Sequence, residues 1–182
     1  EVSLNRIKNK DYQIEERMVL KTSYGQNKDW YALNEIVVEK GGISRLIDLH
    51  ISTGTEFIGS FSADGLIIAT PTGSTAHSMS AGGPIINPKM QAIILSPICP
   101  QSLAVRPIIF SPEEIIRIRV ETLQKEAILT VDGQITHPIK SGAEIIIEKA
   151  QHTVNLITFP ERSFFEILRQ KLHWGVKPKA GT

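Results

Sequence analysis

Residues 62–88, SADGLIIATPTGSTAHSMSAGGPIINP, join a short apolar run to a dense group of small hydroxyl residues. The apolar run at 65–70 predicts a buried strand. The Thr, Ser and Gly residues after it let a ligand approach the main chain closely, and the hydroxyls both donate and accept hydrogen bonds. A short helix starting near Thr75 would add free backbone amides to such a ligand cradle. An ordinary surface loop has the same composition, so both interpretations stay open at this point.

The flanking sequence is rich in short runs of Ile and Val bounded by Gly, Pro, Asp and Ser. In residues 115–120, Ile116, Ile118 and Val120 alternate with arginines, as expected for a strand buried on one face. Runs of this kind at a spacing of about 10 residues predict an all-β domain, an antiparallel sandwich or a barrel. We expect an antiparallel β-sandwich over residues 1–160, with a tight hairpin turn at Asp132–Gly133. The further runs lie at 32–40, 44–51, 56–61, 91–96, 106–110, 126–133, 143–150 and 152–159.

The carboxyl-terminal segment, 161–182, has a different pattern. Phe164, Leu168 and Leu172 recur at helical spacing and predict an amphipathic helix. Ser163 and Glu166 fit a capping box, in which each side chain satisfies an unpaired backbone amide of the first turn. The apolar face of this helix would dock either on the sheets of this chain or on a neighbouring domain.

The composition narrows the possible classes of protein. The chain has 182 residues, with 20 Lys and Arg against 19 Asp and Glu, a formal net charge of +1. This balance predicts neither nucleic acid nor an anionic membrane as a partner. Cys99 is the single cysteine, which excludes an internal disulfide framework and fits a reducing cytoplasm. The five histidines lack metal-ligand spacing, so we predict no metal site.

The start of the chain carries its own expectations. The first residues lack the apolar core of a signal peptide, and no apolar run approaches the length of a membrane span. The chain begins with Glu1 instead of Met, so we expect it to have been cut from something longer or processed.

Two further sites combine polar and apolar residues. Asn34 and Glu35 lie in an Ile/Val-rich run and must face opposite sides of a strand, so at least one is expected to point inward. A buried polar group without a partner costs about 1–3 kcal/mol and is suited to receive a ligand. The alternative is that Glu35 faces solvent, and Asp64 has the same ambiguity. The phosphate-loop pattern GxxxxGK[ST], GxGxxG and the hydrolase pattern GxSxG are all absent from the sequence.

Several stretches together resemble the carboxyl-terminal domain of the NAD kinase family. They cover almost the whole chain in the expected order, and the core TPTGSTA with the following Gly-Gly pair is the most specific part. The stretches are NKDYQIEERM at 9–18, NEIVVEKG at 34–41, DGLIIATPTGSTAHSMSAGGPIINP at 64–88, VRPIIF at 105–110, VDGQ at 131–134 and FFEILRQKLHWG at 164–175.

The resemblance implies a two-domain enzyme that phosphorylates the 2′-hydroxyl of the adenosine ribose of NAD to give NADP. The family's amino-terminal α/β domain carries a Gly-Gly-Asp-Gly motif that binds the donor and supplies the catalytic Asp. No GGDG occurs here, so no catalytic residue is assigned in this chain, and the chain alone is expected to be inactive. The helix in 161–182 would then return to the missing domain.

The resemblance also implies where NAD binds. Asn34 and Glu35 would meet the adenosine ribose, and the loop would border the adenine. Asp64 and the backbone near Cys99 would address the nicotinamide end. The family often has Tyr at the position of His77 and a basic residue at the position of Ser62. The implied NAD-binding residues are Asn34, Glu35, Arg45, Asp64, Thr72, Thr75, Ala76, His77, Ser78, Met79, Ser80, Cys99 and Gln134.

Further partners follow from the family in the same way. ATP or polyphosphate would act as donor through the missing domain, with a divalent metal such as Mg²⁺ on its phosphates. A homo-oligomer, dimer or tetramer, would complete each site, with Asp64 and the Cys99 segment reaching across the interface. Two alternatives remain: the β-domain of a related lipid kinase, and a non-catalytic nucleotide-binding β module.

Overall fold

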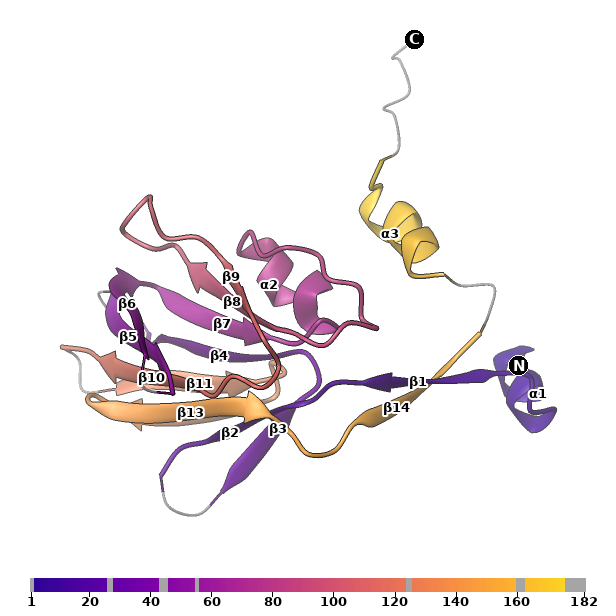
Figure 1. The fold of residues 1–182 in the computed structure, drawn as a ribbon, viewed down its shortest axis with the longest axis horizontal. Coiled ribbons are helices and arrows are strands. Elements are labelled where there is room, and N and C mark those ends of the chain that lie inside the picture. The colour runs from indigo at the N-terminus through magenta and orange to yellow at the C-terminus, as the bar shows by residue number, and fades with distance from the viewer. Residues whose placement is uncertain are drawn as a thin grey trace, which may run out of the picture. The chain divides into compact units, whose positions relative to one another are not determined.

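The computed structural model describes residues 2–25, 28–42, 46–54, 56–123, 126–159 and 163–175 (Figure 1). The chain divides into two compact units. The larger unit is Arg17–Val154, and the smaller combines Glu1–Glu16 with Asn155–Thr182.

The larger unit contains two sheets, each with six strands among the described residues. The first, the β10 sheet, has the order β3 (Asp29–Ala32), β2 (Leu20–Ser23), β13 (Ala143–Lys149), β10 (Ile116–Glu121), β5 (Ile47–Thr53) and β6 (Glu56–Ala63). The second, the β7 sheet, has the order β12 (Ile135–Lys140), β11 (Glu126–Val131), β4 (Glu35–Lys40), β7 (Gly65–Ala69), β8 (Ile93–Ile98) and β9 (Ile108–Phe110). Neighbouring strands within both sheets run antiparallel.

The two sheets pack face to face around one apolar core. The β10 sheet contributes Ile116, Ile118 and Val120, the residues whose alternation with arginine predicts a half-buried strand. The β7 sheet contributes residues such as Leu66 and Ile68 from its inner face. The expected antiparallel sandwich is therefore confirmed.

The outer face of the β7 sheet is covered by the segment that follows β7. This segment contains the 3-10 helix η1 (Gly73–Thr75) and the short helix α2 (His77–Ser80), which lies over β7 and β8 (Figure 1). Beneath it, Val37, Ile67 and Ile94 form a second apolar cluster. Strands β4, β7 and β8 are buried on both faces, which explains their continuous apolar sequences.

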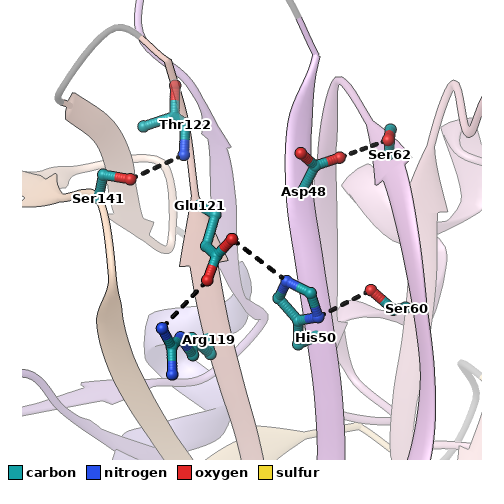
Figure 2. Close-up of polar contacts among 8 residues, drawn as sticks. All are labelled: Asp48, His50, Ser60, Ser62, Arg119, Glu121, Thr122 and Ser141. Carbon is teal, nitrogen blue, oxygen red and sulfur yellow. Dashed lines mark hydrogen bonds and ion pairs between the residues drawn. The ribbon is translucent and has the colours of Figure 1, made fainter.

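The outer face of the β10 sheet is polar, as Figure 2 shows. Ser60 Oγ and His50 Nδ1 are 2.8 Å apart, and His50 Nε2 lies 3.7 Å from a Glu121 carboxylate oxygen. Glu121 also pairs with Arg119 at 3.1 Å. The two sheets thus differ: the β10 sheet exposes its polar outer face, whereas the β7 sheet carries a covering segment that places loop residues against its strands.

The smaller unit contains α1 (Val2–Lys8), α3 (Phe164–Leu172) and most of the strand pair β1 (Gln13–Arg17) and β14 (Val154–Thr158), whose Arg17 and Val154 belong to the larger unit. The predicted helix is confirmed, and the Ser163 side chain caps it by accepting a hydrogen bond from the Glu166 amide at 3.1 Å. Glu166 Oε1 itself accepts from Gln170 at 3.3 Å, one turn along.

The apolar stripe of α3 is only partly covered. Leu168 is buried, whereas Phe165, Ile167 and Leu172 each keep more than a third of their surface exposed. Docking of this helix on a missing domain, and a domain boundary after residue 160, stay predictions. Among the described residues, no helix has the length and apolar character needed to cross a membrane.

Candidate functional site

The site is centred on the turn between β3 and β4. Leu33 and Asn34 form the connection, and Glu35 is the first residue of β4. Glu35 pairs with Ala69 at the end of β7, so the turn lies beside the start of the hydroxyl-rich loop, residues 70–80. Glu35 keeps 7% of its surface exposed, and Asn34 is half-buried. The alternative in which Glu35 faces solvent is therefore wrong.

Two residues from elsewhere in the chain bind the backbone of this turn. Asp132 lies at the tip of the β11–β12 hairpin, and its carboxylate accepts hydrogen bonds from three consecutive amides. The donors are the N–H groups of Leu33, Asn34 and Glu35, at 2.8, 2.8 and 3.0 Å. Thr70 donates from its hydroxyl to the Leu33 carbonyl at 2.6 Å and from its backbone to the Asn34 carbonyl at 2.9 Å. The Asp132 amide donates to the Glu35 carbonyl at 2.9 Å, so every backbone donor and acceptor of residues 33–35 has a partner.

The Glu35 carboxylate carries the most distinctive electrostatics of the site. Its Oε2 is buried and has no hydrogen-bond partner among the described residues. Burial raises the pKa of Glu35, and the nearby Asp132 charge raises it further, while the charge and backbone N–H of His77 act in the opposite direction. Because an unpaired buried polar atom is costly, this oxygen is suited to accept a hydrogen bond from a ligand hydroxyl.

Two hydroxyls of the loop stabilise the fold. Ser74 Oγ is fully buried, donates to the Pro71 carbonyl at 2.7 Å and accepts from the Ile86 amide at 3.0 Å. Ser78 Oγ is also fully buried and lies 2.9 Å from Ser96 Oγ on β8. These bonds fasten the loop to the outer face of the β7 sheet.

Two glycines permit close backbone approach in the same region. A β-carbon at Gly73 would overlap the carbonyl oxygen of Asn34 and lie 2.8 Å from its Cα. A β-carbon at Gly83 would overlap the paired hydroxyls of Ser78 and Ser96. Both contacts require a residue without a side chain.

The other loop residues that the resemblance implies for NAD binding are less buried than Ser74 and Ser78. The short helix expected near Thr75 is present, because α2 begins at His77. Because Ser74 and Ser78 are fully buried, the loop is packed against the sheet, unlike an ordinary surface loop. Of the NAD-binding residues implied by the resemblance, Thr72, Thr75, Ala76 and Met79 are half-buried, whereas His77 and Ser80 are exposed.

Asp64 and Cys99 both lie at the opposite end of β7. The Asp64 amide donates to the Ile98 carbonyl at 3.0 Å, and its carboxylate pairs with Lys40 at 2.5 Å. Cys99 is exposed, with a positive φ of 45°. Strand β7 separates this pair from Thr70 by roughly 20 Å, six residues at a rise of about 3.4 Å each. Within one chain, Asp64 and Cys99 therefore lie apart from the turn at Asn34.

Three more positions complete the comparison with the expected residues. Gln134 is exposed in the hairpin turn that carries Asp132, and its amide donates to the Val131 carbonyl at 3.0 Å. Arg45 lies outside the described residues. The Ser62 hydroxyl donates to the Asp48 carboxylate on the outer face of the β10 sheet (Figure 2).

The predicted hairpin at Asp132–Gly133 is confirmed, with Val131 paired to Ile135 across it. No pattern in the sequence predicts the contact of Asp132 with residues 33–35, because Asp before Gly is already explained by the turn itself. The sequence likewise does not single out Thr70 from the other hydroxyl residues of the loop. The useful signal would have been an acidic residue placed in a turn next to a strand that pairs with β4.

A family model described as the ATP-NAD kinase C-terminal domain matches residues 33–159. The chain belongs to the NAD kinase family. An NAD kinase of Geotalea daltonii is 39% identical over 177 residues, covering 95% of this chain and 62% of the relative. An NAD kinase of Syntrophotalea carbinolica is 40% identical over 178 residues, covering 96% and 62%. The matched span includes Asn34, Glu35 and the whole hydroxyl-rich loop.

Solved structures of NAD kinases share the fold. Yeast NADH kinase, complexed with NADH, superimposes with a TM-score of 0.90 at 28% identity, covering 100% of this chain and 55% of that one. An NAD kinase from Archaeoglobus fulgidus, in complex with ATP, gives a TM-score of 0.79 at 30% identity, covering 94% and 65%. The chain thus spans 62% of the length of the two bacterial NAD kinases above, and its fold is that of the family's carboxyl-terminal domain.

Proposed function

We propose that this chain binds NAD and forms the NAD-binding part of an NAD kinase, which phosphorylates the 2′-hydroxyl of the adenosine ribose to give NADP. The observation that carries the proposal is the buried Glu35 carboxylate, whose Oε2 has no partner among the described residues. Both NAD kinase relatives and the yeast NADH kinase, whose structure is complexed with NADH, support a dinucleotide as the ligand.

The residues of the turn have complementary roles in this proposal. The Asn34 amide donates and accepts hydrogen bonds, and the Glu35 carboxylate accepts one from a ribose hydroxyl. A hydrogen bond to the charged carboxylate orients the 2′-oxygen, which is the nucleophile in the phosphoryl transfer. Positioning of this kind is the main contribution that a protein makes to phosphoryl transfer.

The loop supplies the adenine side of the proposed site. The exposed ring of His77 would stack on the base, next to Thr75 and Ala76, with Thr72, Met79 and Ser80 nearby. Ser78 is different, because its hydroxyl already pairs with Ser96 in the interior. Any contact of Ser78 with the ligand would therefore come from its backbone.

The donor part of the reaction is also a proposal. ATP or polyphosphate would supply the phosphoryl group, and the complex of the Archaeoglobus relative with ATP supports a nucleotide donor. A divalent metal such as Mg²⁺ would accompany the donor phosphates. The described residues contain no group of three or more His, Cys, Asp or Glu side chains arranged to hold a metal ion.

We propose further that NAD is bound between copies of the chain in a cytoplasmic homo-oligomer, a dimer or a tetramer. The separation of Asp64 and Cys99 from the Asn34 turn along β7 supports this idea, since residues expected at both ends of one ligand lie at opposite ends of the strand. Light scattering should show an oligomer at micromolar concentration, and a monomer would contradict this part of the proposal.

Calorimetric titration of the chain with NAD, ATP and a lipid head group tests the proposed function. We expect NAD to bind, and Glu35→Gln and Asn34→Ala each to weaken binding by about tenfold, near 1.4 kcal/mol. Glu144→Gln is the matched control, because Glu144 is exposed on β13 in the other sheet. Binding of the lipid head group but not NAD would favour a lipid kinase domain, and unchanged NAD affinity in Glu35→Gln would remove the main support for the site.

A further inference from the structure

Asp132 has an unusual conformation at the tip of the β11–β12 hairpin. Its φ is +48°, and the following Gly133 has a φ of +65°. Asp tolerates the left-handed region better than most residues, since its short polar side chain bonds locally. Here that side chain contacts a different segment of the chain, the turn at residues 33–35, almost 100 residues earlier in sequence.

Both carboxylate oxygens of Asp132 are used in this contact. Oδ1 accepts from the amides of Asn34 and Glu35, and Oδ2 accepts from the amide of Leu33. Hydrogen bonds from backbone amides to a carboxylate are charge-assisted and roughly twice as strong as neutral ones. The arrangement fixes the backbone on which Asn34 and Glu35 are mounted.

The contact leaves the Asn34 side-chain amide and the Glu35 Oε2 oxygen available to a ligand. Thr70 and Asp132 satisfy all backbone groups of residues 33–35, so neither the Asn34 amide nor the Glu35 carboxylate is needed to hold the turn. Preorganisation of this kind removes part of the ordering cost of binding.

We propose that Asp132 is a positioning residue for the NAD site: its carboxylate holds the backbone of residues 33–35 so that Asn34 and Glu35 face the dinucleotide. Asp132 acts through the turn and makes no contact with NAD. This inference rests on the proposed function, since it assumes that Asn34 and Glu35 bind the ribose.

A second effect of Asp132 gives an independent measurement. Its negative charge raises the pKa of the Glu35 carboxyl, after burial, which is the larger cause. The other charged group that acts on Glu35 is His77, which lowers that pKa. Removal of the Asp132 charge should therefore move the ionisation of Glu35, and any NAD binding that follows it, to lower pH.

The test compares Asp132→Asn with the wild-type chain. An amide has one acceptor oxygen and presents an N–H₂ group where a backbone amide now donates, so at least one of the three bonds is lost. We expect NAD affinity to fall by about tenfold. In NMR spectra, the amide protons of Leu33, Asn34 and Glu35 should shift and exchange faster with solvent.

Asp48→Asn is the matched control. Asp48 undergoes the same chemical change on the outer face of the β10 sheet, where its carboxylate accepts from the Ser62 hydroxyl (Figure 2). We expect this variant to leave NAD affinity and the three amides of residues 33–35 unchanged. A loss of NAD affinity in Asp48→Asn would show that an Asp→Asn change far from the turn has the same effect. That result would overturn the inference that Asp132 has a specific positioning role.

The outcomes separate the two proposals. If the wild-type chain binds no NAD, the proposed function fails. If NAD binds and Asp132→Asn binds it equally well, the positioning role is wrong. A fall in affinity with the three amides unchanged would place Asp132 in direct contact with the ligand, and would also overturn the inference.

One measurement needs no variant and therefore does not depend on Asp132→Asn folding. The amides of Leu33, Asn34 and Glu35 in the wild-type chain should be protected from exchange before NAD is added. Protection that appears only on addition of NAD would show that Asp132 does not hold the turn in advance, and the inference would be wrong.

Discussion

Gly73 and Asn34 are in direct backbone contact: a β-carbon on Gly73 would overlap the Asn34 carbonyl oxygen and approach its Cα to 2.8 Å. The same carbonyl accepts a hydrogen bond from the Thr70 amide. The hydroxyl-rich loop therefore lies against the turn that carries Asn34 and Glu35, and glycine is required because no side chain fits between two main chains.

Gly73→Ala should disrupt this contact. Because the clash is with backbone, it cannot be relieved by moving a flexible side chain, and we expect a loss of about 1–3 kcal/mol in unfolding free energy with NAD affinity reduced at least tenfold. Urea denaturation and NAD titration measure the two effects. Gly59→Ala is the control, since a β-carbon at Gly59 meets nothing within 4 Å, and an equal effect at both positions would contradict the prediction.

Glu35→Gln should stabilise the chain while it weakens NAD binding. The pKa of Glu35 is raised in the folded chain, so the fold favours the protonated carboxyl and disfavours the carboxylate. The stabilisation that the raised pKa of Glu35 provides is fully present below the unfolded-state pKa. It is lost as the pH rises through the folded-state pKa. Thermal melts should thus show Glu35→Gln above wild type near pH 8 and equal to it below about pH 4. A lower melting temperature for the variant near pH 8 would contradict a raised pKa of Glu35 in the folded chain.

His77 gives a prediction about the adenine side. Its exposed ring at the start of α2 should stack on the base, and such stacking is worth roughly 1–3 kcal/mol. We expect His77→Tyr to preserve or tighten NAD binding and His77→Ala to weaken it by about tenfold, near 1.4 kcal/mol. If His77 only fills space, the melting temperature will change and the affinity will not. His152→Ala, at another exposed histidine, is the control.

The pair of Ser78 and Ser96 should behave as a unit. Either single substitution by Ala leaves the other hydroxyl buried without its partner, which costs about 1–3 kcal/mol. Removal of both hydroxyls should cost less than the sum of the two single changes, and a double-mutant cycle in urea measures the difference. Additive effects would show that the two hydroxyls do not interact. NAD affinity should change little in all three variants.

Local patterns predicted much of the fold. Strand β10 was readable because Ile and Arg alternate at period two, and α3 because Ser163 and the spacing of Phe164, Leu168 and Leu172 agree. The early strands β2 and β3 were not predicted, since sequences such as LKTS and DWYA are short and have little apolar alternation. The strand structure of β2 depends on pairing with β13, far along the chain, and β3 in turn pairs with β2.

The site was less predictable than the fold, for a physical reason. The sequence marks Asn34 and Glu35 as unusual, but burial of Glu35 depends on β7 and on the loop that covers the sheet. The role of Asp132 depends on hydrogen bonds to residues 97 to 99 positions away. Short-range patterns contain no information about such partners until the strands are paired.

The distance in sequence between Asp132 and the turn also bears on how the chain folds. Contacts that join segments so far apart require the closure of long loops, whose entropy cost precedes any gain from the contact. Asp132 can reach residues 33–35 only once β11 has paired with β4, and that strand is among the last of its sheet to be synthesised. We therefore expect the ligand-binding turn to become ordered late in folding, so that the ability to bind develops with the completed sheet and not with its first hairpins.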